Sequence, residues 1–131
     1  MDVLMPDVCV VGGITEMDAV SKLADSRGAL VSPHGPFGPV ALLAAAHVMA
    51  AQANFLTLEF GWGVGRPWRS ALLEPAEVVR DGRLVLPRGD GLGARLVESV
   101  AAAHQREVLP PAGAWRRRLP RKRDGRASPR L

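Results

Sequence analysis

Short apolar runs that alternate with helix-forming stretches are the feature that most constrains the fold of this chain. The runs cover residues 3–11, 29–32 and 54–58, and helix-forming stretches follow the first two, from about residue 16 to Gly28 and over residues 40–53. Strands that alternate with helices are typical of parallel βα units. We therefore predict an α/β fold whose first three strands are parallel.

The first run predicts a buried strand followed by a loop. Its β-branched residues are interrupted by Pro6 and Asp7, and two glycines at positions 12 and 13 close it. Thr15 is placed to cap the helix that follows. That helix carries an apolar stripe at helical spacing, which predicts a face packed on a core. The stripe consists of Met17, Val20, Leu23 and Ala24.

The pattern changes after the third run. The dipeptide Asp81-Gly82 separates two apolar segments, residues 78–80 and 83–86, and is a strong signal for a two-residue hairpin turn. A glycine-rich turn at residues 89–93 and a short helix at residues 96–104 are predicted to follow. This antiparallel piece is not a fourth βα unit.

Charge divides the 131-residue chain into two parts. Residues 1–104 carry 8 basic and 11 acidic side chains, whereas residues 105–131 carry 9 basic and 2 acidic ones together with four prolines. Proline and clustered like charge oppose ordered structure. We predict a partial barrel domain at residues 1–104 and a disordered Arg/Pro-rich tail at residues 105–131. Because Trp115 is the tail's single aromatic residue, we favour a solvated tail over a nucleic-acid-binding arm.

Composition excludes several other classes of protein. The single cysteine, Cys9, cannot form an intrachain disulfide and supplies at most one metal ligand, which excludes disulfide scaffolds and cysteine-based zinc modules. The acidic start of the chain lacks the features of a secretory signal. The longest apolar stretch, residues 40–51, falls short of the roughly 20 residues that span a bilayer. We expect a soluble, cytoplasmic protein with no membrane partner.

A titratable side chain lies where each of the three predicted strands ends: Asp7, His34 and Glu59. In a parallel α/β barrel the carboxyl ends of the strands point to one face, where catalytic groups collect. We therefore expect these three groups to converge. A carboxylate beside a histidine sets its tautomer, and a second carboxyl that stays protonated can donate a hydrogen bond to a substrate oxygen. Taken singly, each residue also fits an ordinary turn, loop or helix-cap role.

Other polar and aromatic residues are weaker candidates. His47 lies in the apolar helical stretch and His104 near a helix end, and both fit packing or surface roles. Trp62 and Trp68 flank a glycine-rich loop on the expected active face, where they could line a substrate pocket or anchor the loop. The glycines of that loop lack the spacing of a phosphate-binding fingerprint.

These segments together resemble a known family. Residues 6–16, 33–39 and 89–93, with Glu59, are similar in order and spacing to the C-terminal part of the enolase superfamily, closest to its mandelate racemase and sugar-acid (galactonate-type) dehydratase group. The resemblance covers nearly all of residues 1–104. It implies the last three βα units of an enolase-type TIM barrel, with a C-terminal hairpin extension.

The resemblance also implies a role for each residue at a strand end. His34 resembles the general base or acid that exchanges the proton α to a carboxylate, and Asp7 resembles its dyad partner. Glu59 resembles the last-strand acid that hydrogen-bonds the developing enediolate. The implied substrate is an acid sugar or another 2-hydroxy carboxylate, and the implied reaction is dehydration by a lyase or racemisation by an isomerase. A homo-oligomer is also implied for the parent family.

The cofactor of the parent family is Mg²⁺, which the family holds through acidic residues at the ends of the third, fourth and fifth barrel strands. The first residues of this chain already match the sixth strand, so we expect neither those ligands nor the family's N-terminal capping domain in it. A whole barrel takes roughly 200 residues or more. The first strand of so short a body would present an unpaired edge.

Three functions therefore stay open. The chain is a C-terminal fragment of a magnesium-dependent mandelate racemase-type enzyme, or a non-catalytic truncated remnant of that family, or a nucleic-acid-binding protein that acts through its basic tail. Turnover of a sugar acid that depends on His34 would exclude the remnant. Salt-sensitive nucleic-acid binding that is lost without residues 105–131 would favour the third hypothesis.

Overall fold

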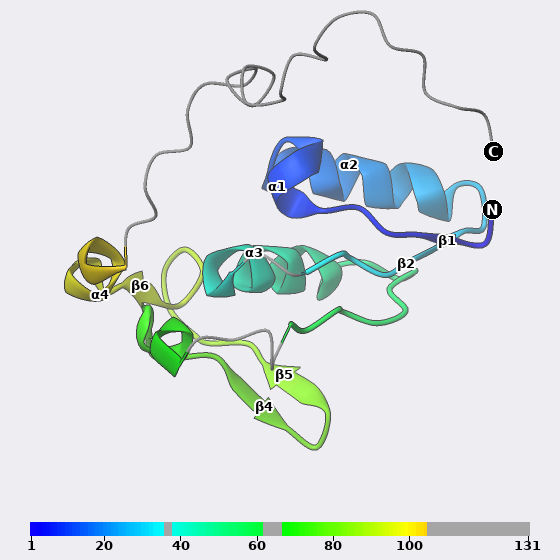
Figure 1. Cartoon of the computed structure of the whole chain (residues 1–131). Helices are drawn as coiled ribbons and strands as arrows, with labels where there is room; N and C mark the ends of the chain where they lie inside the picture. The colour runs from blue at the N-terminus through cyan, green and yellow to red at the C-terminus, as the bar shows by residue number, and fades with distance from the viewer. Residues whose placement is uncertain (36–37, 62–66, 105–131) are drawn as a thin grey trace, which may run out of the picture.

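The computed structural model describes residues 1–35, 38–61 and 67–104. Figure 1 shows helices α2 and α3 side by side, with the hairpin β4–β5 projecting from the rest of the molecule. The predicted disordered tail lies outside the described residues. The elements in chain order are β1 (Val3–Leu4), α1 (Val8–Val11), α2 (Ile14–Asp25), β2 (Leu30–Val31), α3 (Pro39–Met49), η1 (Pro67–Ala71), β3 (Leu73–Glu74), β4 (Val78–Arg80), β5 (Arg83–Val85), β6 (Arg95–Leu96) and α4 (Glu98–Ala103).

The N-terminal strands are parallel, as the alternation of strands and helices predicts. β1 pairs with β2 so that Val3 lies opposite Leu30 and Leu4 opposite Val31. Phe55 then forms a parallel bridge to Val31, which places the third apolar run on the other side of β2. The three segments therefore run in the same direction, and their carboxyl ends lie at one edge.

The third run is less regular than the predicted strand over residues 54–58, since Phe55 alone forms a β-bridge there. The backbone N–H of Leu56 donates to the carbonyl of Val31 at 2.8 Å, and that of Glu59 donates to the carbonyl of Pro33 at 3.2 Å. Between these two bonds the hydrogen-bond ladder from β2 to the third run is interrupted, because Pro33 has no N–H to donate. Glu59 nevertheless stays tied to the end of β2.

The predicted strand across residues 8–11 is wrong, because these residues form the one-turn helix α1. Asp7 adopts an extended conformation and its side chain accepts a hydrogen bond from the backbone N–H of Cys9, which is the geometry of an N-cap. Gly12, at φ 114°, ends the helix in the left-handed region. This local capping outweighs the β-branched composition of the segment.

Helix α2 begins earlier than predicted, and its cap is not Thr15. Gly13 occupies the N-cap position without a side-chain hydrogen bond, so Thr15 lies inside the helix. The predicted stripe is correct at its buried ends, where Met17 is fully buried and Ala24 is 4% exposed, but Leu23 is 62% exposed. Ser21 is buried instead, and its hydroxyl donates to the carbonyl of Met17.

The core lies between β1, β2, α2 and α3. Helix α3 is apolar nearly all round and buries eight of its eleven residues, as expected for a helix covered on several sides. The buried cluster consists of Val8, Met17, Ala24, Ala29, Val31, Ala44, Ala45, Val48 and Met49. Asn54, at the start of the third run, is tied to α2 and to the residue before β2, because its Nδ2 donates to the carbonyls of Ser21 and Ala29.

The C-terminal segment contains the predicted hairpin. β4 and β5 pair antiparallel around Asp81 and Gly82, whose φ values of 49° and 72° are those of a two-residue turn with both central residues left-handed. The antiparallel pair of β3 with β6 was not predicted. Helix α4 lies within the predicted stretch 96–104. None of the helices in the described ranges is long and apolar enough to cross a membrane.

Candidate active site

The structure brings together the three residues that end the parallel segments. Asp7 follows β1 and caps α1, His34 follows β2, and Glu59 follows the third run. Because the strands are parallel, their carboxyl ends share one edge, and residues 27 and 25 positions apart become neighbours. The expectation of convergence agrees with this geometry, while the chemical roles of the residues remain proposals.

His34 and Asp7 form the tighter contact of the site. His34 Nδ1 lies 2.8 Å from Asp7 Oδ2, and the Asp7 side chain is 7% exposed whereas that of His34 is 44% exposed. When the carboxylate is ionised and the imidazole neutral, Nδ1 carries the proton of this contact, because an ionised carboxylate has no proton to donate. Its Nε2 then holds the lone pair and can accept a proton.

Asp7 is held from two sides. Its Oδ1 accepts the backbone N–H of Cys9 at 2.8 Å, while Oδ2 faces His34. The backbone N–H of His34 also donates to the carbonyl of Pro6 at 3.0 Å. Side chain and main chain therefore fix the imidazole relative to the end of β1.

Glu59 approaches the opposite side of the imidazole. Its Oε2 lies 3.9 Å from His34 Nε2, too long for a hydrogen bond, and accepts the backbone N–H of Gly35 at 3.0 Å. The Glu59 side chain is 45% exposed. A half-exposed imidazole thus lies between a buried carboxylate and a half-exposed one.

The described residues do not fit a magnesium site. Within the described ranges no three His, Cys, Asp or Glu side chains lie close enough together to hold a metal ion. Both carboxylates of the site are already engaged, Asp7 with His34 and Cys9, and Glu59 with Gly35. Mg²⁺ requires near-octahedral oxygen coordination, usually through carboxylates and water, which this arrangement does not offer.

A separate apolar groove lies away from these three residues. It has a volume of about 520 Å³ and is lined by α3, residues 55–58, Phe60 and the hairpin β4–β5. Neither Asp7, His34 nor Glu59 lines it. The groove is therefore separate from the cluster of strand-end residues.

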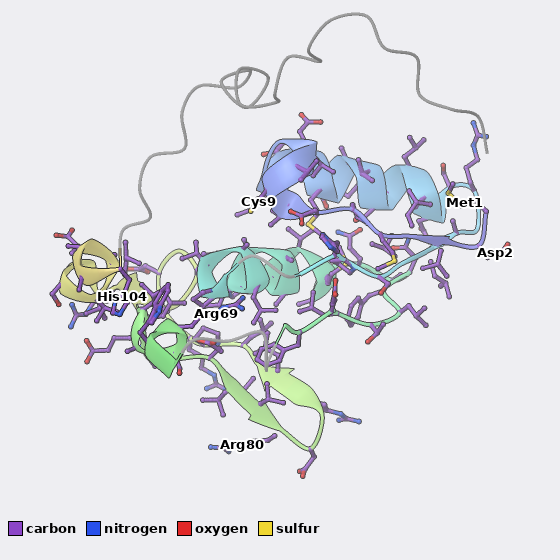
Figure 2. All side chains as sticks on the ribbon, viewed as in Figure 1. Met1, Asp2, Cys9, Arg69, Arg80 and His104 are labelled. Atoms are coloured by element: carbon purple, nitrogen blue, oxygen red, sulfur yellow. The ribbon has the colours of Figure 1, made fainter. Side chains whose placement is uncertain are left out.

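The weaker candidates lie elsewhere. His47 is half-buried in α3, and its Nε2 lies 3.1 Å from the carbonyl oxygen of Leu92, as expected for a packing residue. Trp68 stacks on His104 with ring centroids 4.4 Å apart, a contact that anchors η1 to the end of α4. Figure 2 shows His104 at the end of the molecule opposite Met1. Trp62 lies outside the described residues.

Two backbone groups of the site were missed by sequence reasoning. The N–H groups of Cys9 and Gly35 each donate to a site carboxylate. Main-chain donors leave no direct trace in a sequence. The one available signal was the glycine directly after His34, since a glycine lets main chains approach closely.

Comparisons with known proteins agree with this fold. Relatives include the D-xylonate dehydratase of Haloferax volcanii, 32% identical over 82% of this chain and 26% of that protein. The D-galactonate dehydratase of Ralstonia pickettii is 30% identical over 95% of this chain and 33% of that protein. A solved mandelate racemase/muconate lactonizing enzyme-like protein from Rubrobacter xylanophilus superposes with a TM-score of 0.74 at 35% identity, covering 82% of this chain and 27% of that one.

The fold and these comparisons together define the C-terminal part of an enolase-type α/β barrel. Residues 1–100 match the family described as enolase C-terminal domain-like, and the chain belongs to this family. The predicted family and fold class are therefore confirmed. The chain spans only about a quarter to a third of the length of the curated relatives named above.

Proposed function

We propose that this chain carries the proton-transfer part of an active site that removes the proton α to the carboxylate of a sugar acid. The observation that supports this most directly is the 2.8 Å contact between His34 Nδ1 and Asp7 Oδ2, which leaves Nε2 as the basic atom. The sugar-acid dehydratases among the relatives support the class of substrate.

In the proposed reaction Nε2 of His34 takes the α proton, and the electrons of the broken C–H bond pass to the substrate carboxylate as an enediolate. The imidazolium so formed lies between Asp7 and Glu59. In dehydration the enediolate returns to a carboxylate as a double bond forms between the α carbon and its neighbour, the C–O bond on that neighbour breaks, and its hydroxyl group leaves as water with the imidazolium proton. In racemisation a proton returns to the opposite face of the α carbon.

Glu59 assists the same step from its own side. A carboxyl that stays protonated donates a hydrogen bond to the enediolate oxygen, where negative charge develops. The Mg²⁺ that the resemblance implies would supply Lewis-acid stabilisation of that charge, and none of the described residues would hold it. Because the described residues offer it no site, we propose that turnover also needs residues which the relatives carry outside the matched region.

A graft tests this proposal. Residues 1–104 replace the matching C-terminal segment of the R. pickettii dehydratase, and the purified protein is assayed with Mg²⁺ on D-galactonate, D-gluconate, D-xylonate and L-rhamnonate. We expect dehydration of at least one acid. His34→Ala should lower kcat by about 10²- to 10⁴-fold, the usual contribution of a general acid–base group.

His104→Ala is the matched control, because the His104 ring stacks on Trp68 and lies outside the site. The intact 131-residue chain, assayed alone under the same conditions, shows whether it turns over by itself. A graft that folds and dehydrates no acid, or one whose activity is unchanged by His34→Ala, contradicts the proposal and favours the non-catalytic remnant.

A further inference from the structure

We propose that Gly35 is a positioning residue that gives the two carboxylate oxygens of Glu59 different tasks. Oε2 is held next to His34 by the Gly35 N–H, and Oε1 is the oxygen that meets the substrate. The identity of the group that Oε1 meets rests on the proposed function. The assignment of the two oxygens rests on the geometry alone.

The first support is the hydrogen bond itself. The Gly35 N–H donates to Glu59 Oε2 at 3.0 Å, and the same oxygen is the one nearest to His34 Nε2, at 3.9 Å. Because Oε2 accepts the Gly35 N–H, the proton of a neutral Glu59 carboxyl resides on Oε1. Glu59 can then donate through Oε1 while Oε2 stays an acceptor.

The second support is the absence of a side chain at position 35. A Cβ atom there would collide with the backbone carbonyl oxygen of Glu59. The N–H of Glu59 is bonded to the carbonyl of Pro33 at 3.2 Å, so the two main chains cannot separate without losing that bond. Glycine is therefore required for the amide of residue 35 to reach the Glu59 side chain.

In the proposed reaction this arrangement assigns acceptance of a hydrogen bond to Oε2 and donation of one to Oε1. When Nε2 of His34 becomes protonated, its N–H faces the acceptor oxygen Oε2. The donor Oε1–H stays directed to the enediolate oxygen and is not drawn toward the imidazole. The charge of the imidazolium and the charge of the enediolate are thus met by different atoms of one side chain.

Amide NMR of the full chain tests the assignment without any activity measurement. We expect the Gly35 amide proton to resonate downfield, because it is bonded to Glu59 Oε2. Glu59→Gln should keep the downfield position, because its amide oxygen replaces Oε2 as acceptor. Glu59→Ala should move the resonance upfield.

Two other amides of the same chain serve as controls. The Cys9 amide, bonded to Asp7 Oδ1, should keep its position in all three proteins. The Val31 amide, bonded to the backbone carbonyl of Asn54, should stay unchanged. A Gly35 resonance that is the same in wild type and Glu59→Ala overturns the assignment, whether or not the graft is active.

The graft adds a kinetic readout. Gly35→Ala should lower kcat by about 10²-fold, the cost of displacing a reacting group by about 1 Å. Gly38→Ala is the matched control, because Gly38 has an extended φ of −176° and a Cβ there meets no atom within 4 Å. Glu59→Gln should recover part of the activity that Glu59→Ala loses. If Gly35→Ala and Gly38→Ala have equal kcat, Gly35 does not position Glu59.

Discussion

The carboxylate of Asp7 accepts two N–H groups, that of His34 Nδ1 on Oδ2 and that of the Cys9 backbone on Oδ1, each at 2.8 Å. One side chain therefore both starts helix α1 and orients the imidazole at the end of the neighbouring strand. Each task uses a different oxygen of the same carboxylate, so a substitution that removes the carboxylate affects both.

Asp7→Asn tests this double use. An amide has one acceptor oxygen, so asparagine can satisfy the Cys9 N–H or the His34 Nδ1–H but not both. Since Asp7 is 7% exposed, we expect the free energy of unfolding to fall by about 1–3 kcal/mol in urea titration. Imidazole ¹⁵N NMR should also show a smaller share of the Nδ1–H tautomer. Asp25→Asn, at an exposed carboxylate, should change neither measurement.

Gly35→Ala should also destabilise the chain. The added methyl group collides with the backbone carbonyl of Glu59, and such overpacking usually costs about 1–3 kcal/mol. Gly38→Ala, at the N-cap of α3, should cost no more than about 1 kcal/mol. Thermal unfolding of both variants compares them directly. Equal melting temperatures would show that the end of the third run can shift freely.

Asn54→Ala removes a buried donor that two carbonyls share. The carbonyl oxygens of Ser21 and Ala29, which lie 3.1 and 3.0 Å from Asn54 Nδ2, would lose these hydrogen bonds. Each buried polar group left unsatisfied costs about 1–3 kcal/mol. Ser26→Ala removes an exposed hydrogen bond to the backbone of Leu23 and should cost about 1 kcal/mol or less. A smaller loss for Asn54→Ala than for Ser26→Ala in urea titration would contradict this.

The pH dependence of the α2–α3 contact should follow Asp18. Its hydrogen bond to Lys22, at 2.6 Å, and a second one to Gln52 hold the pKa of Asp18 below the ordinary value of 3.8. A lowered pKa stabilises the fold at pH values above 3.8, and this contribution is lost as the pH falls through the lowered value.

Lys22→Met should therefore raise the pKa of Asp18 toward 3.8, and Lys22→Arg should keep it low. Carboxyl ¹³C NMR follows the titration of Asp18 in each protein. The difference in stability between wild type and Lys22→Met should shrink as the solution is acidified through this range. A pKa that is identical in wild type and Lys22→Met would contradict the assigned cause.

The sequence was sufficient for the parallel strands and for the placement of Asp7, His34 and Glu59 at their ends, because both depend on local patterns. Apolar runs located β1 and β2, and the polar residue after each run located Asp7 and His34. The spacing of these residues also resembled a family that the comparisons confirm. The convergence of the three strand ends at one edge follows from parallel topology, which the alternation of strands and helices predicts.

Features that depend on competition between local forces were predicted less well. Residues 8–11 are β-branched, yet the cap supplied by Asp7 makes them helical. The third run has strand composition, yet Pro33 on its neighbour lacks the N–H that would complete the ladder. The β3–β6 pair joins two-residue segments 21 positions apart, which is too short to give a sequence signal. The Gly35 hydrogen bond is a main-chain contact that no side-chain pattern encodes.

The attachment of each site residue to a parallel strand makes the site a check on correct folding. Side chains on a strand alternate between its two faces, so a slip of β2 by one residue along β1 would turn His34 away from Asp7. The Nδ1–Oδ2 contact can thus form only in the native register. A histidine signal that responds to Asp7 would serve as an assay for properly folded chain in any variant library, with no substrate needed.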